Sequence, residues 1–129
     1  MLGVRVGQHR CFDRLVIDLR GGEPGYTVQY VSQVGGDDEA PPLSLRGGSF
    51  LQVTANAANA TEGPGWLYDQ EIANVSGFRT FREVASAGGF EHHHDVGLGV
   101  RARLPFRVFT LPGPGDGSRL VIDVAHRWQ

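Results

Sequence analysis

The chain has 129 residues, of which 40% are hydrophobic, and its 12 basic and 14 acidic side chains give a formal charge of −2 at pH 7. Folding at this size buries roughly two-thirds of the unfolded surface, so we expect one core and a single domain over residues 1–129. All basic residues are arginine and lie among acidic ones along the chain. A nucleic-acid-binding protein needs a basic stripe, so we exclude that class.

The sequence carries no recognisable export or membrane segment. Its first ten residues lack the apolar run of about 7 to 15 residues that a signal peptide needs, and no stretch approaches the roughly 18 apolar residues of a transmembrane helix. We therefore expect no transmembrane segment. We expect a location in the cell envelope or secretion if an export signal lies outside this sequence, and the cytoplasm otherwise.

The first half of the chain predicts three strands and a long loop. Residues 12–19 alternate between apolar and polar side chains, which is typical of a half-buried strand. Residues 26–31 alternate in the same way after a Gly/Pro-rich turn and are predicted to continue a meander. Residues 35–49 are rich in proline and glycine and predict a loop, whereas residues 50–55 alternate again as the third strand.

The second half begins less regularly. Residues 66–87 predict a loop leading into a strand, although three apolar side chains recur every three residues, as on a short helix. Residues 90–100 alternate again. Residues 105–111 begin with proline, which suits an edge strand. Residues 113–117 predict a turn, and residues 119–124 the last strand.

Short strands and frequent turns together predict an all-β fold. The 19 glycines and 7 prolines favour many turns in a short chain. We therefore expect a small β-sandwich of two packed, mostly antiparallel sheets with about seven or eight strands.

Two nearly identical strands lie near the chain ends, DRLVIDL at 13–19 and SRLVIDV at 118–124. In both copies the leucine and isoleucine alternate toward a common core, which suggests pseudo-symmetry between the N- and C-terminal strands. The outward positions carry Arg14, Asp18, Arg119 and Asp123. We predict that these residues are structural, because cross-strand ion pairs contribute about 0.2–1 kcal/mol and help to set the register without any ligand.

Five segments carry a family resemblance, in one order along the chain. They are FDRLVIDL, GYTVQYV, GGFE followed by GLGV, PFRVFTL and SRLVIDVAH. In this order they resemble the AMIN-like domains of bacterial cell-envelope proteins, over most of the chain. The resemblance implies a β-sandwich of two small sheets.

The same resemblance implies a function without catalysis. Related AMIN domains accompany cell-wall amidases and secretins and are thought to target them to peptidoglycan or the septum. The resemblance therefore implies a binding or targeting module whose partner is peptidoglycan, another glycan or an envelope protein. We expect no enzyme activity and no cofactor.

The run of three histidines at 92–94 offers an alternative. His92 and His94 share one face of a strand and could both reach a metal ion, with His9 or His126 as a further ligand. This would make the protein a small metal-dependent β-barrel enzyme. The competing interpretation is a hairpin tip at which polar residues are tolerated.

Three other features have weaker implications. Trp66 and Tyr68 could stack on a glycan, although large aromatic side chains are more often core residues. Cys11, the only cysteine, shares the phase of the inward residues of its strand, so we expect a buried, inert thiol. The outward Val16 and Val121 leave open a third function, that of a purely structural accessory domain.

Overall fold

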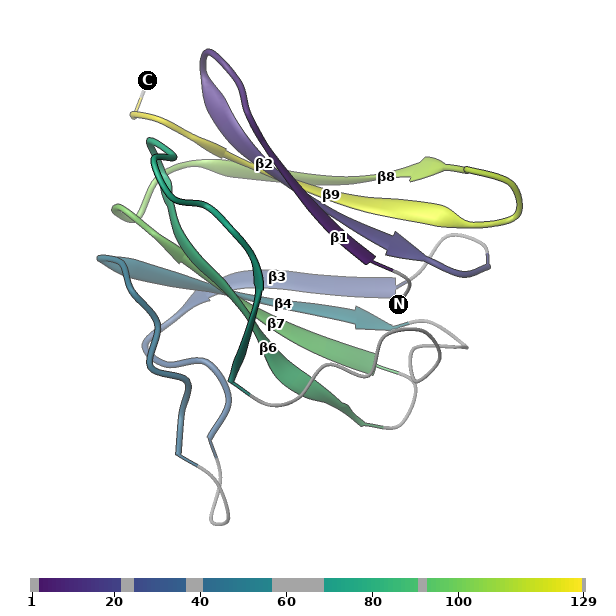
Figure 1. Ribbon diagram of the computed structural model, residues 1–129, viewed down its shortest axis with the longest axis horizontal. Coiled ribbons are helices and arrows are strands. Elements are labelled where there is room, and N and C mark those ends of the chain that lie inside the picture. Colours follow the sequence, from purple (N-terminus) through teal and green to yellow (C-terminus); the bar gives the residue numbers. More distant parts are fainter. Residues whose placement is uncertain (1–2, 22–24, 37–40, 57–68, 91–92, 129) are drawn as a thin grey trace.

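A computed structural model describes residues 3–21, 25–36, 41–56, 69–90 and 93–128 (Figure 1). These residues form nine strands and no helix, so nothing among them is a helix that could cross a membrane. The strands are β1 (Gly3–Gln8), β2 (Phe12–Leu19), β3 (Gly25–Val31), β4 (Ser49–Asn56), β5 (Gln70–Ala73), β6 (Phe81–Phe90), β7 (His93–Val100), β8 (Phe106–Pro112) and β9 (Ser118–Ala125).

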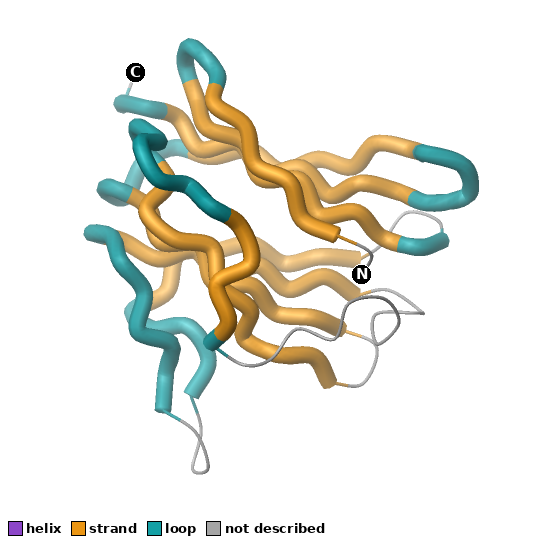
Figure 2. Tube along the Cα trace, viewed as in Figure 1, coloured by secondary structure: helices purple, strands orange, loops and turns teal. Residues whose placement is uncertain are grey.

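The strands form two antiparallel sheets that pack face to face (Figures 1 and 2). Sheet A has the order β1-β2-β9-β8, and sheet B has the order β3-β4-β7-β6-β5. The predicted sandwich is confirmed. Within the described residues the sheets keep open edges, in contrast to the closed barrel that the metal-enzyme alternative assumed.

Two strands raise the count above the seven or eight expected. β1 has six residues, and β5 has only four, with a register shift against β6. Such short segments carry too little alternation to be recognised in isolation. Their strand conformation depends on pairing with β2 and β6, which is tertiary information.

One predicted connection and the bounds of one predicted strand are wrong. β2 lies in sheet A and β3 in sheet B, so the chain crosses between sheets where a meander was expected. Alternation tells which face of a strand is buried but not which strand lies beside it. The strand predicted over 90–100 is also shorter than expected, because residue 90 belongs to β6 and β7 covers His93–Val100.

The core lies between the two sheets and has the predicted phase. The inward residues of the two matching strands are buried, and they pack with the inward residues of β4 and β7. These twelve side chains are Leu15, Ile17, Leu19, Leu51, Val53, Ala55, Val96, Leu98, Val100, Leu120, Ile122 and Val124. Each larger aliphatic side chain among them contributes about 1.5–3 kcal/mol of transfer free energy on full burial.

The loop between β3 and β4 covers the outer face of sheet B. Its described residues form no helix or strand, as predicted, but Val34 and Leu43 are buried. Two glycines of β7 make this packing possible. A Cβ atom on Gly97 would lie 2.8 Å from Leu45 Cδ1, and one on Gly99 would lie 1.9 Å from the Arg46 carbonyl oxygen. The loop therefore packs as a third layer on this part of the sandwich.

One buried carboxylate connects the two sheets. Asp13 points inward from β2 and is fully buried. Its Oδ2 accepts hydrogen bonds from the backbone N–H groups of Thr80 at 2.7 Å and Phe81 at 3.0 Å, where β6 begins in sheet B. These two donors are buried as well, so the carboxylate satisfies groups that water does not reach.

Asp13→Ala should destabilise the fold strongly. The variant leaves two buried N–H groups without an acceptor, at about 1–3 kcal/mol each, so the free energy of unfolding should fall by about 2–5 kcal/mol. Urea unfolding measures this quantity. Asp18→Ala on the same strand is the matched control, because the exposed pair of Asp18 with Arg5 contributes about 1 kcal/mol or less. Equal losses in the two variants would contradict the role given to Asp13.

Candidate functional site

The structure describes some of the predicted site residues and not others. Trp66, Tyr68 and His92 lie outside the described residues, so their predicted roles stay predictions. His94 points inward, is 5% exposed, and its Nε2 lies 3.1 Å from Ser86 Oγ. Among the described residues no group of three His, Cys, Asp or Glu side chains could hold a metal ion. His126 contacts Thr80, which directly precedes β6, whereas His94 pairs with Gly89 near the end of that strand, so the two histidines lie at opposite ends of β6.

A charged cluster lies on the outer face of sheet A. It consists of Phe12, Arg14, Arg107, Phe109 and Asp123, and we call it the arginine face. Arg14 donates from Nε and Nη2 to the two carboxylate oxygens of Asp123, at 2.7 and 2.9 Å. Arg107 donates from Nε to Asp123 Oδ2 at 2.8 Å. Two guanidinium groups thus share one carboxylate that is only 2% exposed.

The two phenylalanine rings hold these guanidinium groups in place. The Cζ atom of Arg14 lies 5.3 Å from the Phe12 ring centre and 5.5 Å from that of Phe109. The corresponding distances for Arg107 are 5.1 and 5.6 Å. At such distances a cation is attracted to the ring by about 0.5–1 kcal/mol at exposed sites. The arginine face is therefore an ordered surface.

The charge of Asp123 is stabilised by these partners. Burial alone would raise the pKa of Asp123, but the hydrogen bonds from Arg14 and Arg107 outweigh it and lower the pKa below its usual value. Asp123 therefore stays ionised over a wide pH range, and two positive charges face one negative charge.

The matching strand does not repeat these contacts. Asp18 pairs with Arg5 of β1 at 2.8 Å, and Arg119 donates to the Pro112 carbonyl at 2.9 Å. The reason is the different neighbour of each strand, β1 beside β2 and β8 beside β9. Nearly identical sequences thus acquire different partners.

An open groove of about 500 Å³ adjoins the arginine face. Its lining is mostly apolar and includes two highly exposed side chains, Arg107 at 62% and Trp128 at 68%. The lining residues are Cys11, Phe12, Pro105, Phe106, Arg107, Asp123, Ala125 and Trp128. We call it the Trp128 groove. The shared outward phase of Arg107 and Phe109 on one strand could have indicated the arginine face, but it carries no sign of the groove beside it.

Cys11 corrects one prediction. Its side chain is exposed, whereas the phase of β2 predicted burial. The strand begins at Phe12, and the chain turns tightly before it, with the His9 N–H bonded to the Phe12 carbonyl at 2.9 Å. The alternation of the strand therefore does not extend to Cys11, which lines the Trp128 groove instead.

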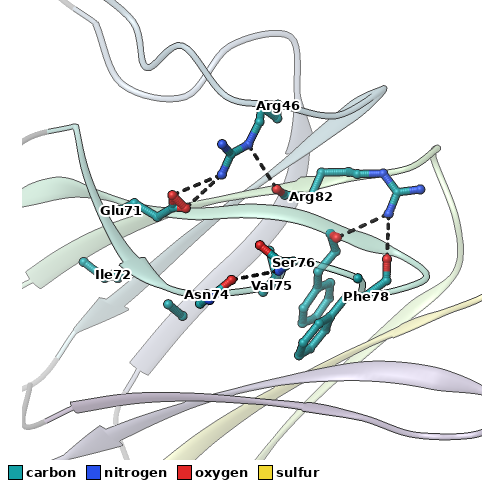
Figure 3. Close-up of a pocket in the computed structure, with 11 residues that line it drawn as sticks. Arg46, Glu71, Ile72, Asn74, Val75, Ser76, Phe78 and Arg82 are labelled. Atoms are coloured by element: carbon teal, nitrogen blue, oxygen red, sulfur yellow. Dashed lines mark hydrogen bonds and ion pairs between the residues drawn. The ribbon is translucent and has the colours of Figure 1, made fainter.

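A second cavity, of about 1030 Å³, lies beside β5 and the turn that follows it (Figure 3). Its charged groups are already bonded within the protein. Arg46 pairs with Glu71 at 2.8 Å, and Arg82 donates to the carbonyls of Phe78 and Arg79 at 3.0 and 3.1 Å. A polar ligand would have to break these bonds, so the larger cavity is the poorer binding site.

A buried trio has the order of a nucleophile, a base and an acid. Thr80 Oγ1 lies 2.7 Å from His126 Nδ1, and His126 Nε2 lies 3.9 Å from Asp13 Oδ1. However, His126 Nε2 donates to the carbonyl of His9 at 2.8 Å, and all three members of the trio are buried. A nucleophile must reach its substrate, so this trio is suited to structure and not to acyl transfer.

The Asp123 cluster predicts a defined pH dependence. Above about pH 5, Asp123→Asn should be less stable than the wild type by about 1.5–3 kcal/mol, because the hydrogen bonds to a charged acceptor are weakened. The folded pKa of Asp123 is below the unfolded value of about 3.9, so this contribution is present above that value and is lost as the pH falls through the folded pKa. Urea unfolding between pH 2 and 7 should show the two proteins converging at low pH. A constant difference would contradict the assignment.

The exposed thiol predicts rapid labelling of the native protein. A thiol reagent should modify Cys11 at nearly the same rate in buffer and in urea, because no unfolding is needed to reach it. Mass spectrometry of the single adduct follows the reaction. Protection of the native thiol by a hundredfold or more would restore the buried assignment.

Comparison with known proteins connects this geometry to a family. The family model for the AMIN-like domain matches residues 1–126, nearly the whole chain. No curated protein matches the chain. The two packed antiparallel sheets agree with the fold that the sequence resemblance implied. The chain belongs to the AMIN-like domain family.

Proposed function

We propose that this protein is a non-catalytic binding module of the bacterial cell envelope and that it binds peptidoglycan in the Trp128 groove. Membership of the AMIN-like family supports a role in envelope binding or targeting. Such a role requires an export route, so the natural protein is expected to act outside the cytoplasm.

The observation that carries this proposal is the exposed tryptophan beside an apolar floor. Trp128 and Tyr26 are the exposed large hydrophobic side chains among the described residues, and Trp128 lines the groove defined above. Exposed aromatic rings present a flat apolar face with a polar edge, which suits the stacking of sugar rings. The groove thus combines a stacking surface with the polar groups that orient a ligand.

The backbone holds Trp128 at the groove. Two residues earlier, the His126 N–H donates to the Cys11 carbonyl at 3.0 Å, and Arg101 donates to the His126 carbonyl. His126 itself is buried. The tryptophan is therefore exposed on an anchored segment, which lowers the entropy lost on binding.

The accessory-domain alternative has less surface to use. Val121 is buried, and Val16 is partly buried, so the two outward valines offer little apolar area to a partner. Trp66 and Tyr68 remain a predicted second contact with the glycan.

Sedimentation with purified peptidoglycan tests the proposal. Trp128→Ala should weaken binding about tenfold, or about 1.4 kcal/mol, because the stacking surface is lost. Its melting temperature should be unchanged, since the side chain is exposed. Tyr26→Ala is the matched control, because Tyr26 is 39% exposed on edge strand β3 of sheet B and does not line the groove. This variant should bind as the wild type does.

The outcomes separate clearly. Failure of the wild type to sediment with peptidoglycan would refute the proposed function. Wild-type binding that Trp128→Ala leaves intact and Trp66→Ala abolishes would move the site to the segment around Trp66.

A further inference from the structure

We infer that the Trp128 groove is a carboxylate-binding site in which Arg107 pairs with a free carboxylate of a peptide attached to the glycan. This inference rests on the proposed function for its ligand, and it names the chemical group that the site selects.

The first support is the unused half of the Arg107 guanidinium group. Arg107 contacts Asp123 through Nε alone. Within the described residues, its Nη1 and Nη2 atoms make no hydrogen bond, and the side chain is 62% exposed. A guanidinium group presents its N–H donors in a planar fork that matches the two oxygens of a carboxylate. Arg107 thus has free donors at the rim of the groove.

The second support is the charge balance of the arginine face. Arg14 and Arg107 carry two positive charges and Asp123 one negative charge, so one positive charge is left over. Arg14 spends Nε and Nη2 on Asp123, which leaves the surplus at Arg107. One surplus charge is complementary to a singly charged group.

The floor of the groove favours a carboxylate over a phosphate. Asp123 lines the groove and would repel the second charge of a phosphate monoester. Phe12, Phe106 and Ala125 offer apolar surface beside Arg107. A carboxylate joined to an aliphatic carbon, as at the end of a peptide, fits both features.

The third support is preorganisation. Phe12, Phe109 and Asp123 already hold the Arg107 guanidinium group. An ordered side chain loses less rotamer entropy when it binds. Arg5 is equally exposed at 60%, but it already donates from Nε and Nη2 to both oxygens of Asp18. Exposure alone does not distinguish the two arginines, whereas the free donors do.

The test compares two soluble peptidoglycan fragments, disaccharide–peptides that differ only in a free or an amidated terminal carboxylate. Isothermal titration into the full chain should show at least tenfold tighter binding of the free carboxylate by the wild type. Arg107→Met should bind both fragments with the same affinity. Arg5→Met is the matched control and should keep the tenfold preference. Raising the salt concentration should reduce the wild-type preference, because the contact is between exposed charges.

Each other outcome overturns the inference. Equal binding of the two fragments by the wild type removes the carboxylate contact but leaves peptidoglycan binding in place. A tighter fit of a phosphate-bearing glycan fragment overturns the choice of anion. Loss of the preference in Arg5→Met as well assigns it to overall charge. If neither fragment binds and the wild type does not sediment with peptidoglycan, the proposed function fails too. The comparison of the two fragments with the wild type needs no variant, so it tests the inference even if Arg107→Met does not fold.

Discussion

The antiparallel pairing of β2 with β9 is the constraint on which the rest of the structure depends. It places Val16 opposite Val121, the same position in the two copies of the matching sequence, so the two copies pair antiparallel about this point. Leu15 then meets Ile122, and Ile17 meets Leu120, on the inward face. The pairing joins segments from the two ends of the chain, and the sandwich is complete only when both are present.

The same pairing creates the candidate site on the opposite face. It sets Arg14 opposite Asp123, and the neighbouring edge strand adds Arg107 to the same carboxylate. The carboxylate then has more cationic partners than it can neutralise. A contact that stabilises the sheet thereby leaves a positive group facing solvent beside an apolar groove.

Asp13 and Asp123 are both buried aspartates, but their different hydrogen-bond partners give them different effects on the structure. Asp13 faces inward and bonds to backbone N–H groups of the other sheet, so its effect is on how the sheets dock. Asp123 faces outward and bonds to side chains, so its effect reaches the surface. The two cavities differ in the same way. The charged groups that line the larger one are bonded to each other or to the backbone, whereas the smaller one is lined by an arginine with unused N–H donors.

The sequence by itself determined the all-β class, the inward faces of the matching strands, and the family, because period-two alternation and segment order are properties of the chain. Only the tertiary structure decided that β2 pairs with β9 and not with β3, that Asp18 takes Arg5 as its partner, and that Cys11 lies in a groove. The physical reason is that alternation records which side of a strand is buried, whereas strand neighbours depend on contacts between residues distant in sequence. The Trp128 groove is assembled from three separate segments, so no local pattern could reveal it.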